Sequence, residues 1–235
     1  MIKALLAGPP TLHNQGYLEY LLPEISKFYK HSKNIIFIPY ARPGGISMEE
    51  YTRKAAKAFS KAGLELKGIQ DFEDPAEAIA HADGIFTGGG NTFLLVYELY
   101  RKQIMNNLKE VINNGIPYMG TSAGTNIAGL TMQTTNDMPI IYPPSFKTLG
   151  LVPFNINPHY LDPDPASTHK GETRETRIKE FHTLNSQPVV GLREGSWLEI
   201  ANNKLTLKGE PEARIFMQDK LSYEIQTGTN LNDLN

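Results

Sequence analysis

Short apolar runs alternate with helix-like segments through the first half of the sequence. The run at 34–38, Asn-Ile-Ile-Phe-Ile, ends at Pro39 and is followed by a segment whose apolar residues recur at helical spacing. A continuous apolar run of this length is typical of a strand buried on both faces. Strands that alternate with helices over short connections predict a parallel sheet with helices on both faces. The expected strands are at 2–7, 34–38, 64–69, 84–87 and 116–119.

The pattern changes after residue 130, where prolines become frequent. A helix is predicted over 172–184 and a buried strand over 189–192. Segments 197–200 and 204–207 alternate between apolar and polar residues, which indicates antiparallel strands at the edge of the sheet. We therefore expect a mostly parallel α/β sheet with a small antiparallel edge near the C-terminus, in a single domain of residues 1–235.

Composition narrows the class of protein. The formal net charge is -2, and without a basic surplus no binding of nucleic acid is expected. The sequence has no cysteine, which excludes disulfides, a thiolate nucleophile and cysteine-ligated zinc. The N-terminal apolar run is too short for a signal peptide, and no stretch reaches the length of a membrane span. We therefore expect a soluble, cytoplasmic protein with no membrane partner.

A possible nucleophile lies at 120–124, where Gly-Thr-Ser-Ala-Gly matches the G-x-S-x-G pattern of a nucleophile elbow. The pattern places Ser122 at the apex of a sharp turn between a strand and a helix, where flanking side chains would clash. Such a turn lifts the hydroxyl clear of the sheet and aims the backbone N–H of Ala123 at the same spot. The alternative is an ordinary glycine-rich turn, because the bare motif is common by chance.

A second glycine-rich loop, Gly-Gly-Gly-Asn at 88–91, follows a predicted strand and opens a helix. Glycines let the backbone approach a ligand closely, and N–H groups at the start of a helix favour a phosphate or a developing oxyanion. Since loops after neighbouring parallel strands lie side by side, we expect an oxyanion hole built from the N–H groups of Gly89, Gly90 and Ala123. The alternative is a tight turn that binds nothing.

A serine nucleophile needs a histidine base and an acid that orients the histidine. Of the six histidines, His159 follows an apolar segment at 151–156 and lies beside Pro158, so it is favoured as the base. His169, in a polar loop, is the competing candidate. The other four histidines are expected at the surface or in or beside helices: His13, His31, His81 and His182.

Two carboxylates are candidates for the orienting acid. Glu194 follows the apolar run 189–192, and a glutamate at the end of a buried strand is unusual unless it has a partner or a role. Asp137, in Thr-Asn-Asp-Met-Pro, is the second candidate. A solvated loop carboxylate is the alternative interpretation of Glu194.

Several possible metal ligands lie close together in the sequence: His159, Asp162, Asp164 and His169. Their spacing matches no helix-borne pair of the H-E-x-x-H kind. Prolines at 163 and 165 make Asp-Pro turns a sufficient explanation for the aspartates. We therefore expect neither a metal nor a cofactor.

Five segments occur in an order that matches a known family: Gly-Gly-Gly-Asn, Gly-Thr-Ser-Ala-Gly, Asn-Asp-Met-Pro, Asn-Pro-His and Arg-Glu-Gly-Ser-Trp. With them the sequence closely resembles the peptidase E family of α-aspartyl dipeptidases, from about residue 5 to residue 216. The resemblance implies a flavodoxin-like, three-layer α/β/α fold related to class I glutamine amidotransferases. In those relatives the elbow carries cysteine where this chain has Ser122. The resemblance also implies a triad of Ser122, His159 and Glu194.

The resemblance further implies a substrate, because members of this family cleave dipeptides that begin with aspartate. Arg174 matches the position whose cation would hold the substrate β-carboxylate, a task that suits a guanidinium. Its alternative is a surface arginine at the start of a helix. Asp137 matches an aspartate that the family needs near the site. Thr121 and Arg193 depart from the family, since well-known members carry Trp and Pro beside the nucleophile and the acid.

The resulting hypothesis is a serine dipeptidase that acts on small Asp-Xaa peptides, as a monomer or a homodimer. One alternative is a related serine peptidase, such as a cyanophycinase-like enzyme that acts on aspartyl polymers. Another is a non-catalytic protein that binds a small anion at the triglycine loop. A third is an esterase of the α/β-hydrolase type, whose acid would precede His169 or His182.

Overall fold

The computed structural model describes residues 1–163, 166 and 171–234. Its largest sheet contains these strands: β1 (Ala4–Ala7), β2 (Ile35–Ile38), β3 (Leu66–Gly68), β4 (Gly84–Thr87), β5 (Tyr118–Thr121), β8 (Ser196–Ala201) and β9 (Lys204–Gly209). Their order across the sheet is β3-β2-β4-β5-β1-β8-β9. The first five strands of that order are parallel, and β8 and β9 are antiparallel at one edge. The predicted fold class is therefore confirmed.

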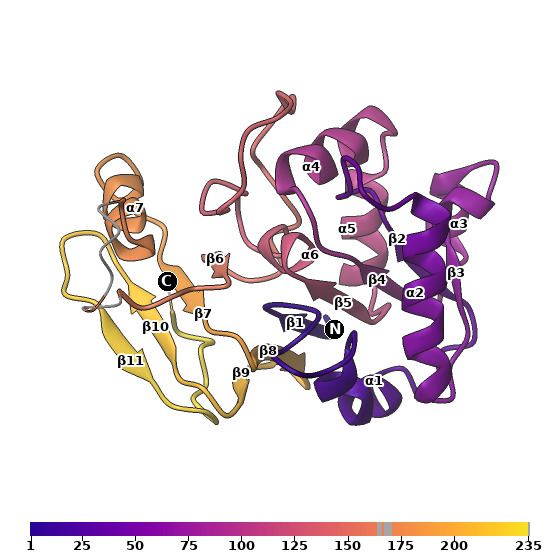
Figure 1. Ribbon diagram of the computed structural model, residues 1–235, viewed down its shortest axis with the longest axis horizontal. Helices are drawn as coiled ribbons and strands as arrows, with labels where there is room; N and C mark the ends of the chain where they lie inside the picture. Colours follow the sequence, from indigo (N-terminus) through magenta and orange to yellow (C-terminus); the bar gives the residue numbers. More distant parts are fainter. Residues whose placement is uncertain (164–165, 167–170, 235) are drawn as a thin grey trace.

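Helices cover both faces of this sheet (Figure 1). They are α1 (Leu22–Phe28), α2 (Met48–Lys61), α3 (Pro75–Ala80), α4 (Thr92–Arg101), α5 (Met105–Asn113) and α6 (Ala123–Asn126), with 3-10 turns at Glu19–Leu21 and Ile69–Asp71. α1 and α2 share a hydrophobic cluster with one face of the sheet, and α3 to α6 share another with the opposite face. In the part of the chain that the structure describes, no helix is both long and apolar enough to cross a lipid bilayer.

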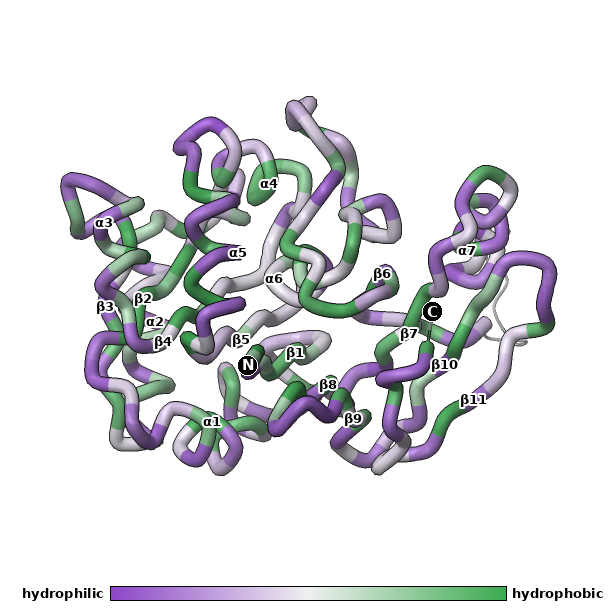
Figure 2. The backbone as a smooth tube through the Cα atoms, turned by 180° about the vertical axis from the view of Figure 1, so that it is seen from behind, coloured by the Kyte–Doolittle hydropathy of each residue, from purple (hydrophilic) through white to green (hydrophobic). Residues whose placement is uncertain are grey.

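The two hydrophobic clusters follow from the alternation of side chains along buried strands. Leu5 packs with the α1 and α2 cluster, whereas the next residue, Leu6, packs with the α3 to α6 cluster. Both are almost completely buried. The apolar residues of these helices face the sheet, and Figure 2 shows hydrophobic and hydrophilic stretches alternating along α5. Because helices cover both faces of the sheet, the central strands are apolar on both sides and appear as continuous apolar runs in the sequence.

Local signals at the helix ends account for the helix boundaries. The Ser47 side chain accepts from the Glu50 backbone N–H, and the Glu50 side chain accepts from the Ser47 N–H, which forms a capping box at α2. Gly63, just beyond α2, has a φ of +74°, as a glycine stop requires. Asp74 and Asn91 cap α3 and α4 through their side chains.

A second sheet was not predicted. It contains β6 (Asn155–Pro158), β7 (Val189–Leu192), β10 (Ala213–Phe216) and β11 (Tyr223–Ile225). The order is β11-β10-β7-β6, and only β6 and β7 are parallel. α7 (Arg174–Phe181) packs on this sheet through Ile178, and Figure 1 shows both set away from α2 and α3. An apolar run such as β7 identifies a buried strand but does not say which strands pair with it.

The two sheets meet where their parallel strands end. A Cβ on Gly8, the residue after β1, would lie 3.9 Å from the His159 nitrogen and 3.7 Å from the Arg193 carbonyl oxygen. β5 pairs with β1 in parallel, so the turn after β5 lies at the same edge. The loops after strands of both sheets therefore converge on one place, which is where ligands bind in open α/β sheets.

Candidate active site

Ser122 occupies a strained turn between β5 and α6. Its φ is +54° and its ψ is -111°, a conformation that a residue with a side chain rarely adopts. Its N–H is fixed by the first strand, since it donates to the Gly8 carbonyl at 2.6 Å and to the Ala7 carbonyl at 3.2 Å. The turn predicted from the G-x-S-x-G pattern is therefore present.

The glycines of the elbow are required by close approach of the backbone. A Cβ on Gly120 would lie 2.4 Å from the Gly124 carbonyl oxygen, and a Cβ on Gly124 would lie 2.3 Å from the Thr87 carbonyl oxygen. These distances are far below van der Waals contact, and backbone atoms cannot move aside cheaply. The strand-to-helix turn that presents Ser122 thus depends on both glycines.

Ser122, His159 and Glu194 form a hydrogen-bonded series. His159 Nε2 lies 3.0 Å from Ser122 Oγ, and His159 Nδ1 lies 3.2 Å from Glu194 Oε1. His159 follows β6 and Glu194 comes soon after β7, so the second sheet supplies the partners of a serine mounted on the first. A proton on Nδ1 would be donated to the carboxylate and leave Nε2 free to accept from the serine hydroxyl.

The loop after β1 lines the same region. Tyr20 donates its hydroxyl to the Pro9 carbonyl at 2.7 Å. Burial, with a smaller contribution from the Glu194 carboxylate, raises the pKa of Tyr20 well above its ordinary value. The phenol therefore stays protonated at neutral pH. Sequence reasoning missed Tyr20, because it belongs to no motif and reaches the site only through folding of this loop.

The triglycine loop lies directly against the nucleophile. A Cβ on Gly89 would be 2.7 Å from Ser122 Cβ. The Gly89 N–H, however, donates to Tyr51 Oη at 2.9 Å, which corrects the expectation of a free oxyanion donor at this position. Gly90 and Ala123 have backbone N–H groups without an acceptor among the residues that the structure describes. Tyr51 lies on α2, far from Gly89 in the sequence, so no local signal pointed to this bond.

Asp137 fastens a long loop to the start of α4. Its Oδ2 accepts from the Thr92 N–H and the Thr92 hydroxyl, each at 2.7 Å, and from the Thr135 hydroxyl at 3.0 Å. A carboxylate at a helix N-terminus is also favoured by the helix dipole. The neighbouring Asn136 donates to the Pro158 carbonyl at 2.8 Å, next to His159. Asp137 is thus close to the site, but the acid hydrogen-bonded to His159 is Glu194.

Arg174 is a half-buried cation at the first position of α7. Within the described ranges it forms no hydrogen bond or ion pair. Desolvation and then the neighbouring Arg177 lower the pKa of Arg174, while the Asp137 carboxylate opposes the shift. The guanidinium remains charged under all ordinary conditions. It can therefore bind an anion near Asp137 without first breaking another pair.

His81 and His182 have other partners, and His169 lies outside the described residues. His81 Nδ1 lies 3.0 Å from the Glu77 carbonyl at the end of α3, and His182 Nε2 lies 3.0 Å from the Gln187 carbonyl after α7. His169 and Asp164 fall outside the described residues. Among residues 1–163, 166 and 171–234, no group of three or more His, Cys, Asp or Glu side chains could hold a metal ion.

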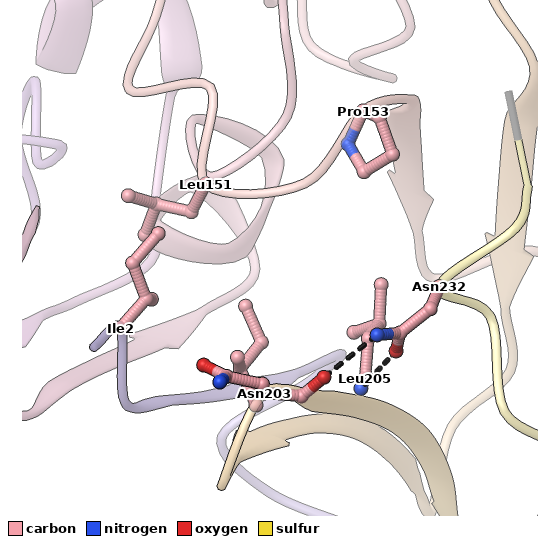
Figure 3. A pocket seen from close by; sticks show the side chains of 7 residues that line it. Ile2, Leu151, Pro153, Asn203, Leu205 and Asn232 are labelled. Carbon is pink, nitrogen blue, oxygen red and sulfur yellow. Dashed lines mark hydrogen bonds between the residues drawn. The ribbon is translucent and has the colours of Figure 1, made fainter.

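Figure 3 shows a pocket whose lining residues include none of the candidate site residues. Ile2, which lines it, precedes β1, so the pocket is at the amino edge of the sheet, whereas Ser122 is at the carboxyl edge. The Asn232 side chain in this pocket donates to the Asn203 carbonyl at 2.6 Å and accepts from the Leu205 N–H at 2.7 Å. The pocket therefore belongs to the packing of the C-terminal segment on β9.

The sequence and the fold both match known proteins. The model of peptidase family S51 matches residues 4–208. A "Peptidase E" of Streptomyces coelicolor is 46% identical over 99% of this chain and 95% of its own. A "Probable alpha-aspartyl dipeptidase" of Drosophila melanogaster is 43% identical over 94% of this chain and 92% of its own.

Among solved structures, a peptidase from an acI-B1 Actinobacterium is similar in fold. It superimposes with a TM-score of 0.71 at 18% identity, over 98% of this chain and 96% of that chain. This likeness supports the fold, and the sequence matches cover almost the whole chain. The chain therefore belongs to peptidase family S51, a family of serine peptidases.

Proposed function

We propose that this peptidase is a dipeptidase that hydrolyses substrates of the form Asp-Xaa with Ser122 as its nucleophile. The observation that carries the proposal is the series from Ser122 Oγ to His159 to Glu194, with distances of 3.0 and 3.2 Å. Each distance is suitable for proton transfer or for orientation of the imidazole. The elbow adds a backbone conformation that presents the serine hydroxyl.

The first half of the reaction would be acylation. His159 Nε2 takes the proton of Ser122 while Oγ bonds to the carbonyl carbon of the N-terminal aspartyl residue. His159 then gives that proton to the leaving amine as the C–N bond breaks. In the second half, water attacks the ester with the same base, and aspartate is released with Ser122 restored. Glu194 holds the imidazole and stabilises its charged form.

The oxyanion would be held by two backbone N–H groups. Gly90 and Ala123 have N–H groups with no acceptor in the described part of the chain, and they flank the contact between the triglycine loop and Ser122. Loss of one such donor typically slows a reaction by about 10²–10³-fold. The hydrogen bond from the Gly89 N–H to Tyr51 would keep the triglycine loop in place. Gly89 would thus help to position the loop and would not itself donate to the oxyanion.

Arg174 would select substrates with an N-terminal aspartate. Its guanidinium forms no hydrogen bond or ion pair with the described residues, and an arginine binds a carboxylate through two parallel hydrogen bonds. The name of the Drosophila relative supports an aspartyl substrate for this chain. Asp137, held by three hydrogen bonds at the start of α4, would keep the loop beside Arg174 in place.

The test is hydrolysis of aspartyl p-nitroanilide beside its leucyl, glutamyl and isoaspartyl analogues, with wild type and Ser122→Ala. We expect cleavage of the aspartyl compound to exceed that of the others and to disappear in the variant. Comparison of Asp-Leu with an aspartyl polymer separates a dipeptidase from a polymer hydrolase. Equal cleavage of the leucyl and aspartyl compounds would reject the substrate assignment, and equal activity of Ser122→Ala would reject the nucleophile.

A further inference from the structure

The hydrogen-bonded ladder between β6 and β7 ends just before the base and the acid. The last pair in register is Pro158 with Leu192. One more bond follows, from the Tyr160 N–H to the Leu192 carbonyl at 3.0 Å. His159 and Glu194 therefore lie where the regular pairing of strands stops, and contacts beyond the ladder determine how far apart they are.

Glu194 has little that fixes its carboxylate. Its side chain is 47% exposed, and its hydrogen bond to His159 is the only one it makes within the described part of the chain. The next residue, Gly195, has a φ of +94° and so allows a sharp change of direction. The position of the carboxylate thus depends on what anchors the residue before it, which is Arg193.

Every N–H group of the Arg193 guanidinium donates a hydrogen bond. Nε and Nη2 donate to the two carboxylate oxygens of Asp162 at 2.7 and 2.8 Å. Nη1 and Nη2 donate to Glu224 at 2.7 and 3.0 Å, and Nη1 also donates to the Glu212 carbonyl at 2.9 Å. A guanidinium has five N–H groups, and these five bonds use all of them. Its side chain is only 19% exposed.

The anchor of Arg193 reaches the segment that carries His159. Asp162 lies three residues after His159, on the same stretch of chain beyond β6. The Arg193 guanidinium also lies over the ring of Tyr160, 5.5 Å from its centroid. Tyr160 is 1% exposed and follows His159 directly. Arg193, the residue before the acid, is therefore joined to Tyr160 and Asp162, which follow the base.

We propose that Arg193 is a positioning residue that sets the distance between His159 and Glu194 by clamping Asp162 and Tyr160 beside them. The proposal rests on the proposed roles of Ser122, His159 and Glu194. It requires the planar fork of arginine, because a lysine ammonium cannot donate to both oxygens of Asp162 and to Glu224 in one plane. The Arg193 hydrogen bonds also lower the pKa of Asp162, so the clamp is fully charged at neutral pH.

The test compares Arg193→Lys and Arg193→Met with Arg101→Gln, which removes an arginine of an exposed ion pair on α4. We expect kcat for aspartyl p-nitroanilide to fall by roughly 10–100-fold in both Arg193 variants, since a small misplacement of reacting groups has effects of this size. KM should change by less than about 2-fold if substrate binding is left intact. Arg101→Gln should behave as wild type in both constants.

A second readout does not require the substrate. The rate at which diisopropyl fluorophosphate phosphorylates Ser122 depends on the base, and it should fall in parallel with kcat in both Arg193 variants. If Arg193→Met does not fold, Asp162→Asn offers a milder break of the same clamp. The double variant Arg193→Lys/Asp162→Asn should be no slower than Arg193→Lys alone, because the two residues act as a unit.

Full kcat and full labelling in Arg193→Lys would overturn the proposal, because charge alone would then suffice. A change confined to KM would overturn it as well, since the clamp would then act on substrate binding. Failure of the proposed function looks different. If the proposed function is wrong, the wild type will show no aspartyl-selective cleavage, or Ser122→Ala will cleave as fast as the wild type. If only the Arg193 proposal is wrong, the discrepancy will appear in the Arg193 and Asp162 variants alone.

Discussion

The nucleophile and its base are held by two different kinds of structure. Ser122 is held on the large sheet mainly by uncharged contacts: its N–H bonds to β1 and the loop after it, and the glycines of the elbow pack directly on other backbone atoms. His159 and Glu194 are mounted on the small sheet, where partly exposed side chains and a network of charged groups keep them in place. We therefore expect the first arrangement to respond less to pH and salt than the second, which depends on charge.

The strongest test of this contrast is a substitution that pushes the elbow apart. In Gly124→Ala the new Cβ would meet the Thr87 carbonyl at 2.3 Å. We expect a loss of stability of about 3 kcal/mol or more, typical of severe overpacking, and no detectable peptidase activity. Gly44→Ala is the matched control, since nothing lies within 4 Å of its Cβ position. Urea unfolding measures both, and wild-type stability in Gly124→Ala would contradict the packing argument.

Removal of the acid should affect catalysis without affecting the fold. In Glu194→Gln the amide can present a donor to His159 Nδ1, which favours the wrong tautomer. We expect kcat to fall by roughly 10²–10⁴-fold, up to the size seen when the triad acid of a serine protease is neutralised. The melting temperature should change little, because the side chain is half exposed. Activity within 3-fold of wild type would show that Glu194 does not orient the base.

Arg174 should act on substrate choice more than on chemistry. We expect Arg174→Ala to raise KM for aspartyl p-nitroanilide by roughly 10–100-fold, since hydrogen bonds to charged groups typically contribute 1.5–3 kcal/mol. The slow cleavage of the leucyl analogue should be unchanged. Arg177→Ala removes a more exposed arginine of the same helix and serves as the control. An equal loss for both substrates would mean that Arg174 supports the site in general.

The smallest expected effect is a dependence of stability on pH. The Asp162 pKa is lowered in the folded state, chiefly by its hydrogen bonds to Arg193. The stabilisation is therefore present above the ordinary aspartate pKa of about 3.9 and is lost as pH falls through the lower folded value. Thermal unfolding of wild type and Asp162→Asn should differ at pH 7, and the difference should narrow progressively as pH falls below about 3.9. A difference that persists unchanged at low pH would exclude the charge as its source.

Local and long-range features differ in how far the sequence revealed them. The elbow at Ser122 depends on a few adjacent residues, so the G-x-S-x-G pattern in the sequence predicted it. The bond between Gly89 and Tyr51 joins residues 38 positions apart, and it removed a donor that the triglycine pattern had suggested.

Charged contacts were the hardest to foresee. Arg193 bonds Asp162 and Glu224, each 31 residues away, across strands of a sheet that was not predicted. In the sequence Arg193 was visible only as a departure from the family, with nothing to suggest what it contacts. Which strands pair is decided by the whole chain, so the partners of such a residue become apparent only in the folded protein.

The most direct test of the central claim is to inactivate the enzyme with diisopropyl fluorophosphate and map the label. Activity towards aspartyl p-nitroanilide should fall in proportion to the label incorporated, with one equivalent on the peptide that contains Ser122 and none in Ser122→Ala. His159→Gln should be labelled far more slowly than wild type. Loss of activity with the label on another serine, or full activity with Ser122 labelled, would contradict the account of Ser122 as the nucleophile.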